Sequence, residues 1–269
     1  MMLMLRVENI TKTYKLTKKQ MKLENIKDSQ KVAANDISFF VRPGEIFGLL
    51  GPNGAGKTTT LRCMSTLIKP DMGNIYMNLG NEEINVIEEA DKARQYLSFL
   101  TNELKLEDHF SPNYLVSFFG RLYGLDEEAI EANKAKLFTK FGIDEFAELK
   151  VSQLSTGMKQ KTSIAVSLVH NPPIIIFDEP TNGLDVLTAK VITDYLQELR
   201  NEGKAIIIST HIMSIAEKLC DRIGIIIDGK IRMVGTLKEI LEKTNTTDLE
   251  DAFFNIYKGI KDQEVNDNE

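Results

Sequence analysis

The most informative run of residues in this chain is Gly51-Pro52-Asn53-Gly54-Ala55-Gly56-Lys57-Thr58-Thr59. It follows the apolar run Ile46–Leu50 and precedes a stretch with helical periodicity, so it satisfies the pattern G-x-x-x-x-G-K-[ST] between a strand and a helix. The glycines let the backbone curl until successive N–H groups point at anionic oxygens, and the helix adds the partial positive charge of its N-terminus. We expect Lys57 to reach the β- and γ-phosphates and the Thr58 hydroxyl to ligate Mg²⁺. The nine residues therefore predict a P-loop that binds ATP or GTP.

Outward from this loop, short β-branched runs alternate with helical stretches. Each run is followed by a polar or Gly-rich break, and its unbroken apolar character is typical of a parallel sheet covered on both faces. The β-then-α order predicts an α/β fold with right-handed crossovers. The predicted strands are Glu45–Leu50, Ile174–Phe177, Ala205–Ser209 and Ile223–Ile227, and the predicted helices are Thr59–Thr66, Ile130–Phe141, Met158–Val169 and Leu187–Arg200.

The middle of the chain differs, because from about residue 102 to residue 169 it has helix signals and no convincing strand. We interpret this stretch as a helical subdomain inserted into a single α/β domain. The predicted boundaries are 1–245 for the whole domain, with its core at about 1–98 and 170–245 and its helical part at about 99–169, and 246–269 for a C-terminal helix and acidic tail.

Two peripheral segments stand out by composition. Lys15–Lys31 holds six lysines against two acidic residues, which predicts a solvated loop between two strands or, alternatively, a contact with lipid headgroups or a partner. At the other end, one apolar face predicts a packed helix, and we expect the acidic segment Lys261–Glu269 beyond it to fray. That apolar face consists of Leu249, Phe253, Ile256, Tyr257 and Ile260.

Composition limits the class of protein. The 269 residues are 42% hydrophobic and 27% charged, which excludes a disordered tail, a collagen and a mucin-like stalk. No apolar run approaches the roughly 20 residues of a membrane-spanning helix, and the N-terminus lacks the apolar core of a secretory signal. The formal net charge of −6 does not favour nucleic acid, and Cys63 and Cys220 have no metal or disulfide spacing. We therefore expect a soluble cytoplasmic protein.

An acid pair indicates what happens to the bound nucleotide. The predicted strand Ile174–Phe177 ends in Asp178 and Glu179. Asp178 can hold the hydration shell of Mg²⁺ opposite Thr58, and Glu179 can orient an attacking water and accept its proton. One acid after a strand is common, but two adjacent acids in a chain with a P-loop favour hydrolysis.

A histidine follows the next strand of the predicted sheet. His211 lies just past Ile206–Ser209, where ligands of open α/β sheets collect, so we favour a contact with the γ-phosphate. His109 and His170 lack this position, and we interpret them as structural.

A second motif then points to a family. Leu154-Ser155-Thr156-Gly157-Met158-Lys159-Gln160-Lys161 resembles the signature L-S-G-G-Q of ATP-binding cassette (ABC) transporters, and the resemblance covers roughly Leu3 to Leu241. It implies a P-loop NTPase (RecA-like) core with an inserted helical subdomain, the ABC ATPase fold, and it implies ATP and Mg²⁺ as cofactors. In this family two subunits pack head to tail, so Ser155 and Gly157 would contact the γ-phosphate held by the other subunit.

The same resemblance assigns four further residues. Asn182-Gly183-Leu184-Asp185 matches the D-loop and places Asp185 near the nucleotide, and His211 matches the switch histidine. Tyr14 falls where the family stacks an aromatic ring on adenine, with a half-buried strand residue as the alternative. Asn102 falls at the Q-loop position of a glutamine that meets Mg²⁺, and its side chain is one methylene shorter than that glutamine.

Within the family, Glu45–Thr60, Phe119–Gly124 and Leu154–Lys161 are similar to one-domain bacterial ABC-2 exporters, in particular to the sodium-extrusion type. The resemblance implies an ATPase that powers efflux, of sodium ions in that likeness, through a separate transmembrane permease subunit. It also implies a second ABC ATPase subunit as partner, in a homodimer, no nucleic acid partner, and a place on the cytoplasmic face of the cell membrane.

Two other functions compete with this interpretation. A soluble ABC ATPase acting on nucleic acid or ribosomes is the first, although such relatives usually carry long coiled coils or two cassettes. A nucleotide kinase is the second, and it needs an acceptor site for which the sequence offers no candidate. The transported substrate binds the other subunit, so these residues do not identify it.

Overall fold

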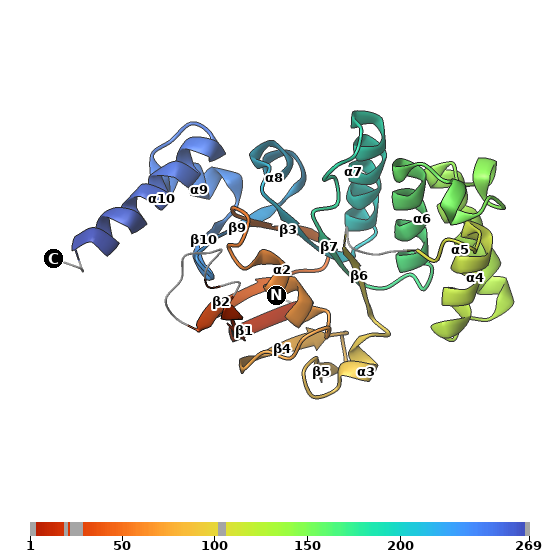
Figure 1. Cartoon of the computed structure of the whole chain (residues 1–269), viewed down its shortest axis with the longest axis horizontal. Helices are drawn as coiled ribbons and strands as arrows, with labels where there is room; N and C mark the ends of the chain where they lie inside the picture. The colour runs from red at the N-terminus through yellow and green to blue at the C-terminus, as the bar shows by residue number, and fades with distance from the viewer. Residues whose placement is uncertain (1–3, 19–20, 22–28, 102–105, 267–269) are drawn as a thin grey trace.

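The computed structural model describes residues 4–18, 21, 29–101 and 106–266, and the strands in these ranges form two sheets (Figure 1). An antiparallel sheet has the strand order β2-β1-β4-β5, and a larger sheet has the order β10-β9-β3-β8-β7-β6. The strands are β1 (Leu5–Lys15), β2 (Gln30–Val41), β3 (Glu45–Leu50), β4 (Met72–Asn78), β5 (Glu83–Asn85), β6 (Leu97–Thr101), β7 (Ile174–Asp178), β8 (Ala205–Thr210), β9 (Arg222–Ile227) and β10 (Lys230–Gly235).

Helices connect these strands, and several begin at a side-chain cap. Ser111, Asp126, Ser155, Asp185 and Thr236 each accept a hydrogen bond from a backbone N–H in the first turn of their helix, which fixes where that helix starts. The helices are α2 (Lys57–Met64), α3 (Ala90–Ala93), α4 (Pro112–Leu122), α5 (Glu127–Phe141), α6 (Thr156–Leu168), α7 (Val186–Asn201), α8 (Met213–Leu219), α9 (Leu237–Thr244) and α10 (Leu249–Asn266).

The larger sheet is parallel except at one edge. β3 pairs in parallel with β8 and β9, β7 pairs in parallel with β8 and β6, and only β10 runs antiparallel to its neighbour β9. Every residue of β3, β7 and β8 is buried, as the unbroken apolar runs predict. All four strands expected from the sequence are confirmed, with shifts of one residue at most at each end.

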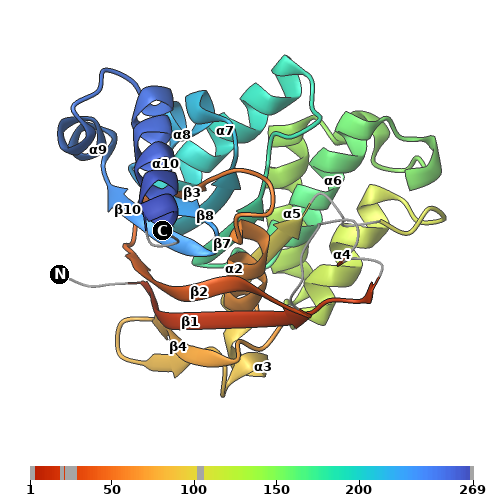
Figure 2. The same cartoon turned by 60° about the vertical axis from the view of Figure 1, so that its left-hand side comes forward.

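Helix α2 lies between the two sheets (Figure 2). Its residues Leu61 and Met64 are fully buried in a cluster that also contains Val7 and Ile75 of the antiparallel sheet and Leu49 of the parallel sheet. Because both faces of α2 are covered, the loop that precedes it is held at the junction of the two sheets.

The opposite face of the parallel sheet carries α7, α8 and the helical part of the chain. There α4, α5 and α6 pack on one another through Leu115, Phe138 and Ile164. No strand lies between residues 106 and 169 of the described chain, as predicted. Strand β6, however, continues to Thr101, past the residue at which the sequence places the start of the helical part.

The C-terminal segment packs on the β9–β10 edge (Figure 1). Leu249, Phe253 and Ile260 are buried there and Ile256 is partly buried, as predicted, whereas Tyr257 is exposed, and α10 continues to Asn266. The expectation that the segment from Lys261 onward frays is therefore wrong as far as Asn266. Among the residues that the structure describes, no helix has the length and apolar character needed to cross a membrane.

Candidate nucleotide site

The P-loop, Gly51–Gly56, connects the end of β3 to α2. Gly56 has a φ of 104°, and a Cβ atom at this position would lie 2.1 Å from the carbonyl oxygen of Ala33 on β2. Only glycine fits so close to another strand in this conformation. No side chain caps the N-terminus of α2, which leaves its first N–H groups for the oxygens of a phosphate.

The side chain of Lys57 folds back onto the P-loop and bonds to its carbonyl oxygens. Its ammonium donates to the carbonyl oxygen of Gly51 over 2.7 Å and to that of Pro52 over 3.1 Å, and it lies 3.8 Å from Glu179 Oε1. Burial lowers the pKa of Lys57, and the negative charges of Glu179 and Asp178 oppose this shift. The structure thus places a cation against the loop, where we expect the γ-phosphate.

The carboxylate of Glu179 is the centre of the polar contacts around the loop. Its Oε1 atom lies 3.0 Å from His211 Nδ1, and Asn182 Nδ2 donates to its Oε2 atom over 2.9 Å. The side chain is 18% exposed, so it is shielded but accessible. The structure therefore brings together the three residues predicted to be catalytic, Lys57, Glu179 and His211, in an arrangement that can orient a water and accept its proton.

Asp178 and Thr58 carry oxygen atoms of the kind that Mg²⁺ prefers as ligands. Asp178 is 8% exposed and accepts a hydrogen bond from the Ser209 hydroxyl, and Thr58 faces the pocket described below. In the described ranges, no group of three or more His, Cys, Asp and Glu side chains could hold a metal ion. Mg²⁺ usually takes one or two protein ligands together with phosphate oxygens and water, and this donor set fits such a shared site.

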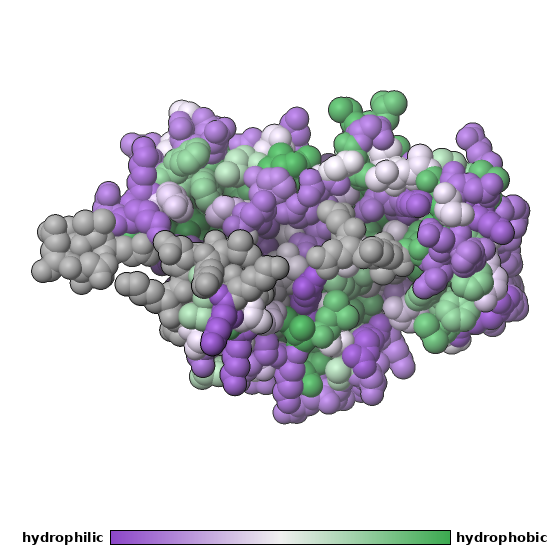
Figure 3. Space-filling model, in the orientation of Figure 1, coloured by the Kyte–Doolittle hydropathy of each residue, from purple (hydrophilic) through white to green (hydrophobic). Residues whose placement is uncertain are grey.

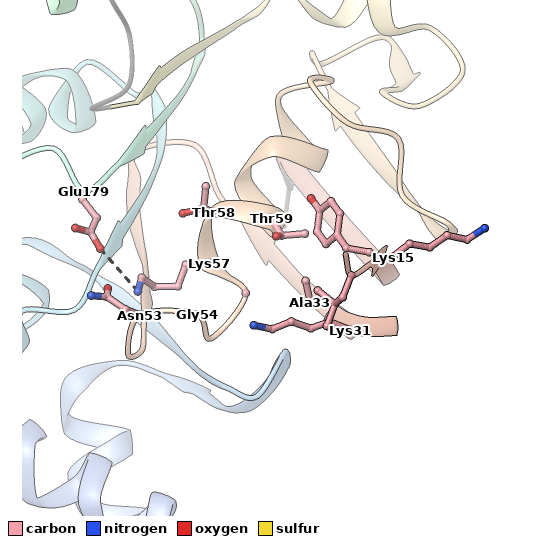
Figure 4. Close-up of a pocket in the computed structure, with 12 residues that line it drawn as sticks. Lys15, Lys31, Ala33, Asn53, Gly54, Lys57, Thr58, Thr59 and Glu179 are labelled. Atoms are coloured by element: carbon pink, nitrogen blue, oxygen red, sulfur yellow. Dashed lines mark ion pairs between the residues drawn. The ribbon is translucent and has the colours of Figure 1, made fainter. Parts of the chain in front are cut away.

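A pocket of about 360 Å³ opens beside the P-loop (Figure 4). The loop and the start of α2 form one wall, the ends of β1 and β2 form the opposite wall, and Glu179 lies at one end. The lining residues are Tyr14, Lys15, Leu16, Lys31, Ala33, Asn53, Gly54, Gly56, Lys57, Thr58, Thr59 and Glu179.

The β1–β2 wall holds both a predicted residue and residues that the sequence does not predict. Tyr14 lines the pocket and is 37% exposed, which suits a ring that stacks on a base. Lys31 is its partner in the β1–β2 register, and Ala33 lies two residues further along β2. In Figure 4 the side chain of Lys31 extends toward the P-loop and that of Lys15 extends away from it. The six-lysine run was the only sequence signal for these two cations.

The predicted signature residues lie outside this pocket. Ser155 caps α6 and accepts a hydrogen bond from Met158 N over 3.3 Å. A Cβ at Gly157 would lie 3.2 Å from Thr188 Oγ1, so the start of α6 packs against the start of α7. Within one chain, Ser155 and Gly157 therefore do not face the P-loop pocket.

Asp185 has a clear local role at the start of α7. Its Oδ1 atom accepts hydrogen bonds from the N–H groups of Leu187 and Thr188, both over 3.0 Å, and its Oδ2 atom accepts from the Thr188 hydroxyl over 2.7 Å. The bonds from Thr188 and Leu187 hold the pKa of Asp185 below its usual range. Asp185 is thus a helix cap in this structure and does not line the pocket.

Of the three remaining sequence assignments, the two histidines lie away from the pocket and the third is not described. Asn102, the predicted Q-loop residue, lies outside the described residues. His170 stacks on Tyr123 with 3.7 Å between ring centroids, and burial lowers its pKa to about 4. His109 is exposed and does not line the pocket, so neither histidine takes part in the site.

Comparison with known proteins finds a matching family model and similar proteins. The family model described as ABC transporter matches residues 34–182. The chain is 35% identical over 237 residues to the ABC transporter ATP-binding protein NatA of Bacillus subtilis, with 87% of this chain and 95% of NatA covered. It is 37% identical over 212 residues to the Nod factor export ATP-binding protein I of Burkholderia lata, with 79% of this chain and 68% of that protein covered.

A solved structure of similar fold is the dimeric, post-hydrolysis ATP-binding cassette MJ0796 bound to ADP and Pi. Its TM-score to this chain is 0.75 at 27% sequence identity, and the superposition covers 87% of this chain and 99% of MJ0796. This similarity confirms the fold class predicted from the sequence.

Proposed function

Because the chain belongs to the ABC transporter family and is one of its ATP-hydrolysing subunits, we propose that it powers export through a separate membrane-spanning subunit. The observation that carries this proposal is the Glu179 carboxylate, held 3.0 Å from His211 and 3.8 Å from Lys57 at the end of the P-loop pocket. Similarity to a Nod factor export ATP-binding protein supports the direction of transport.

The proposed hydrolysis uses these residues as follows. Lys57 and the N–H groups at the start of α2 hold the γ-phosphate, and Mg²⁺ bound by Thr58 and Asp178 would neutralise the charge that develops on it. Glu179 orients the attacking water and takes its proton, and His211 keeps that carboxylate in place. Tyr14 stacks on the adenine ring at the opposite wall of the pocket.

The active unit is proposed to be a head-to-tail pair of chains. Ser155 and Gly157 do not face the pocket of their own chain, but at the start of α6 they offer a hydroxyl and backbone N–H groups to a phosphate held by a partner. The dimeric MJ0796 cassette supports this arrangement. Each site then consists of the P-loop of one chain and the α6 N-terminus of the other.

Two measurements on Glu179→Gln test the ATPase and the pair together. We expect release of inorganic phosphate without any added acceptor to fall at least about 100-fold, since a general base contributes typically 10²- to 10⁴-fold. Light scattering with Mg-ATP should show a dimer, because the pair forms and cannot hydrolyse its nucleotide. Glu88→Gln, an exposed substitution that does not line the pocket, is the matched control. Wild-type turnover by Glu179→Gln would contradict the assignment of the base, and a monomer with ATP would contradict the pair.

A membrane-spanning partner has a candidate contact surface on the helical part. Phe110, Tyr114 and Phe118 are 40%, 46% and 44% exposed and stack in one row, with 4.5 Å and 6.1 Å between successive ring centroids. The row begins two residues before α4 and continues on that helix. On the face drawn in Figure 3, a green area interrupts the purple surface over the helices at the right, where Figure 1 places α4. Exposed aromatic rows are typical of protein interfaces. We assign this row to the membrane-spanning subunit.

Co-purification tests this assignment. Phe118→Ser should lose the membrane protein encoded in the neighbouring reading frame and keep the ATPase rate of the isolated chain. Phe254→Ser removes an equally exposed ring on α10 and should keep the partner. Capture of nucleic acid or ribosomes instead of a membrane protein would favour the soluble ABC ATPase.

Sodium is the first cargo to test, because the P-loop, Phe119–Gly124 and Leu154–Lys161 resemble the sodium-extrusion type. Vesicles that hold the chain and its membrane partner should move ²²Na⁺ when ATP is on the side of this chain. Glu179→Gln vesicles provide the control, and equal sodium movement in both would rule out ATP-driven sodium export.

A further inference from the structure

Strand β8 carries a serine in a place where packing alone would favour an apolar residue. The strand reads Ala-Ile-Ile-Ile-Ser-Thr, and Ser209 is fully buried in the parallel sheet. In the register of β7 and β8, Ser209 lies directly opposite Asp178. A buried hydroxyl is costly unless it is hydrogen-bonded, so its partners indicate its purpose.

Ser209 bonds to both acids of the pair at once. Its hydroxyl donates to Asp178 Oδ1 and accepts a hydrogen bond from the backbone N–H of Glu179 over 3.0 Å. A hydroxyl has one hydrogen, which is committed here to the carboxylate, and one of its lone pairs is committed to the N–H. The same oxygen atom therefore ties the proposed Mg²⁺ ligand to the backbone of the proposed base.

The second of these bonds supports an unusual backbone conformation. Glu179 has a φ of 53°, in the left-handed region that residues other than glycine rarely adopt. With the backbone in this turn, the Glu179 carboxylate contacts His211 through Oε1 and Asn182 through Oε2. Without Ser209, the N–H of Glu179 would lose its partner at the start of this turn.

We propose that Ser209 is the positioning residue of the acid pair: it orients Asp178 toward Mg²⁺ and holds the backbone turn that presents Glu179 to the attacking water. The inference rests on the ATP-hydrolysing function proposed above. Ser209 touches neither nucleotide nor water in this role and acts only through its two neighbours.

The matched control is a second buried serine of the same sheet. Ser98 lies on β6, on the other side of β7, and it is 1% exposed, yet its hydroxyl has no hydrogen-bond partner among the described residues. Ser209→Ala and Ser98→Ala remove the same atom at the same depth. Only Ser209→Ala removes contacts to the acids.

Two readouts test the proposal. In Ser209→Ala we expect kcat for phosphate release to fall about tenfold or more, as for a lost bond to a charged group, with KM for ATP changed less than twofold. We also expect the Mg²⁺ concentration that half-saturates binding of a fluorescent ATP analogue to rise. Ser98→Ala should match the wild type in both. Ser209→Thr should restore both, because it keeps the hydroxyl, and Ser209→Cys, with a weak donor, should fall between.

The results separate this proposal from the proposed function. If the wild type binds the analogue with Mg²⁺ but releases no phosphate, the ATPase assignment fails, and the Mg²⁺ dependence still tests Ser209. If Ser209→Ala matches Ser98→Ala in both readouts, Ser209 has no positioning role. If Ser209→Ala does not fold, Ser209→Thr and Ser209→Cys are compared instead, and Ser209→Thr should have the higher kcat and need less Mg²⁺. Equal kcat and equal Mg²⁺ dependence in these two variants would overturn the proposal.

Discussion

Substitution of Gly56 by alanine tests the physical account of the P-loop most directly. The Cβ of this alanine would lie 2.1 Å from the carbonyl oxygen of Ala33, and the backbone φ is 104°. The obstacle is the backbone of β2, which no rotamer change can move. Gly54 offers a matched control in the same loop, because its φ is 81° and a Cβ there has no neighbour within 4 Å.

The overlap with Ala33 is the main difference between the two substitutions. A left-handed backbone costs a residue other than glycine about 1–2 kcal/mol, and this applies at both positions. Replacing glycine also removes conformational freedom from the unfolded chain, which offsets about 0.4–1 kcal/mol in each case. The overlap with Ala33 adds a cost that is typically about 1–3 kcal/mol for overpacked sites. We therefore expect Gly54→Ala to lose about 1 kcal/mol of unfolding free energy and Gly56→Ala about 2–4 kcal/mol.

Urea unfolding followed by circular dichroism, without nucleotide, measures both losses. The expected loss in Gly56→Ala is a large share of the roughly 5–15 kcal/mol that holds a typical domain folded. Equal m-values would show that the variants differ in stability and not in the surface exposed on unfolding. If the two variants lose the same free energy within about 0.5 kcal/mol, the contact between the P-loop and β2 does not constrain the loop and the reasoning fails.

Three other predictions concern the walls of the site and the helical part. Tyr14→Ala should raise KM for ATP several-fold and leave kcat unchanged, whereas Tyr14→Phe keeps the ring and should keep the wild-type KM. Lys31→Glu should raise KM for ATP more at low salt than at high salt, because it reverses a charge that extends toward the P-loop, and Lys15→Glu, which points away, should change it less (Figure 4). Burial lowers the pKa of His170 from 6.5 to about 4, so between these values the unfolded chain binds more protons than the folded one. Unfolding free energy should therefore fall by up to about 3 kcal/mol as the pH drops from about 6.5 toward 4, and His170→Phe should flatten this part of a urea-midpoint profile.

Much of the site could be predicted from the sequence because its parts are local. The P-loop and the acid pair each occupy a few consecutive residues next to a strand, and the strand itself shows in the β-branched run before it. A parallel sheet brings the ends of β3, β7 and β8 to one edge, so Lys57, Glu179 and His211 meet there. The sequence therefore predicts this cluster from local motifs and the order of the strands.

The β1–β2 wall could not be predicted in the same way. Whether Lys31 and Ala33 face the P-loop depends on the register of a long hairpin, and a slip of one residue would turn each side chain to the other face. The register of β1 and β2 shifts at several positions between Val7 and Thr13, so counting residues from Tyr14 does not give it. Periodicity carries no information about such irregularities.

Ser209 and Asp185 were difficult for a different reason. A serine in an apolar run is normally interpreted as a tolerated polar residue of the core. The sequence of β8 alone does not show that Ser209 pairs with Asp178 of β7. Asp185 belongs to a family motif, which alone assigns it to the nucleotide, although aspartate directly before a helix is a common N-cap. The structure shows the cap, with three hydrogen bonds from Leu187 and Thr188.

The contacts of Lys57 suggest how nucleotide binding and the base are coupled. Its buried ammonium is balanced by Glu179 and by two carbonyl oxygens of its own loop. A γ-phosphate brings more negative charge to this cation than one carboxylate does, so we expect it to displace Glu179 as the partner of Lys57. Glu179 would keep its position, because His211 and Asn182 still hold both of its oxygens. Arrival of the phosphate therefore both fills the site and ends the ion pair between Lys57 and Glu179, while the Glu179 carboxylate stays in place to accept a proton from water.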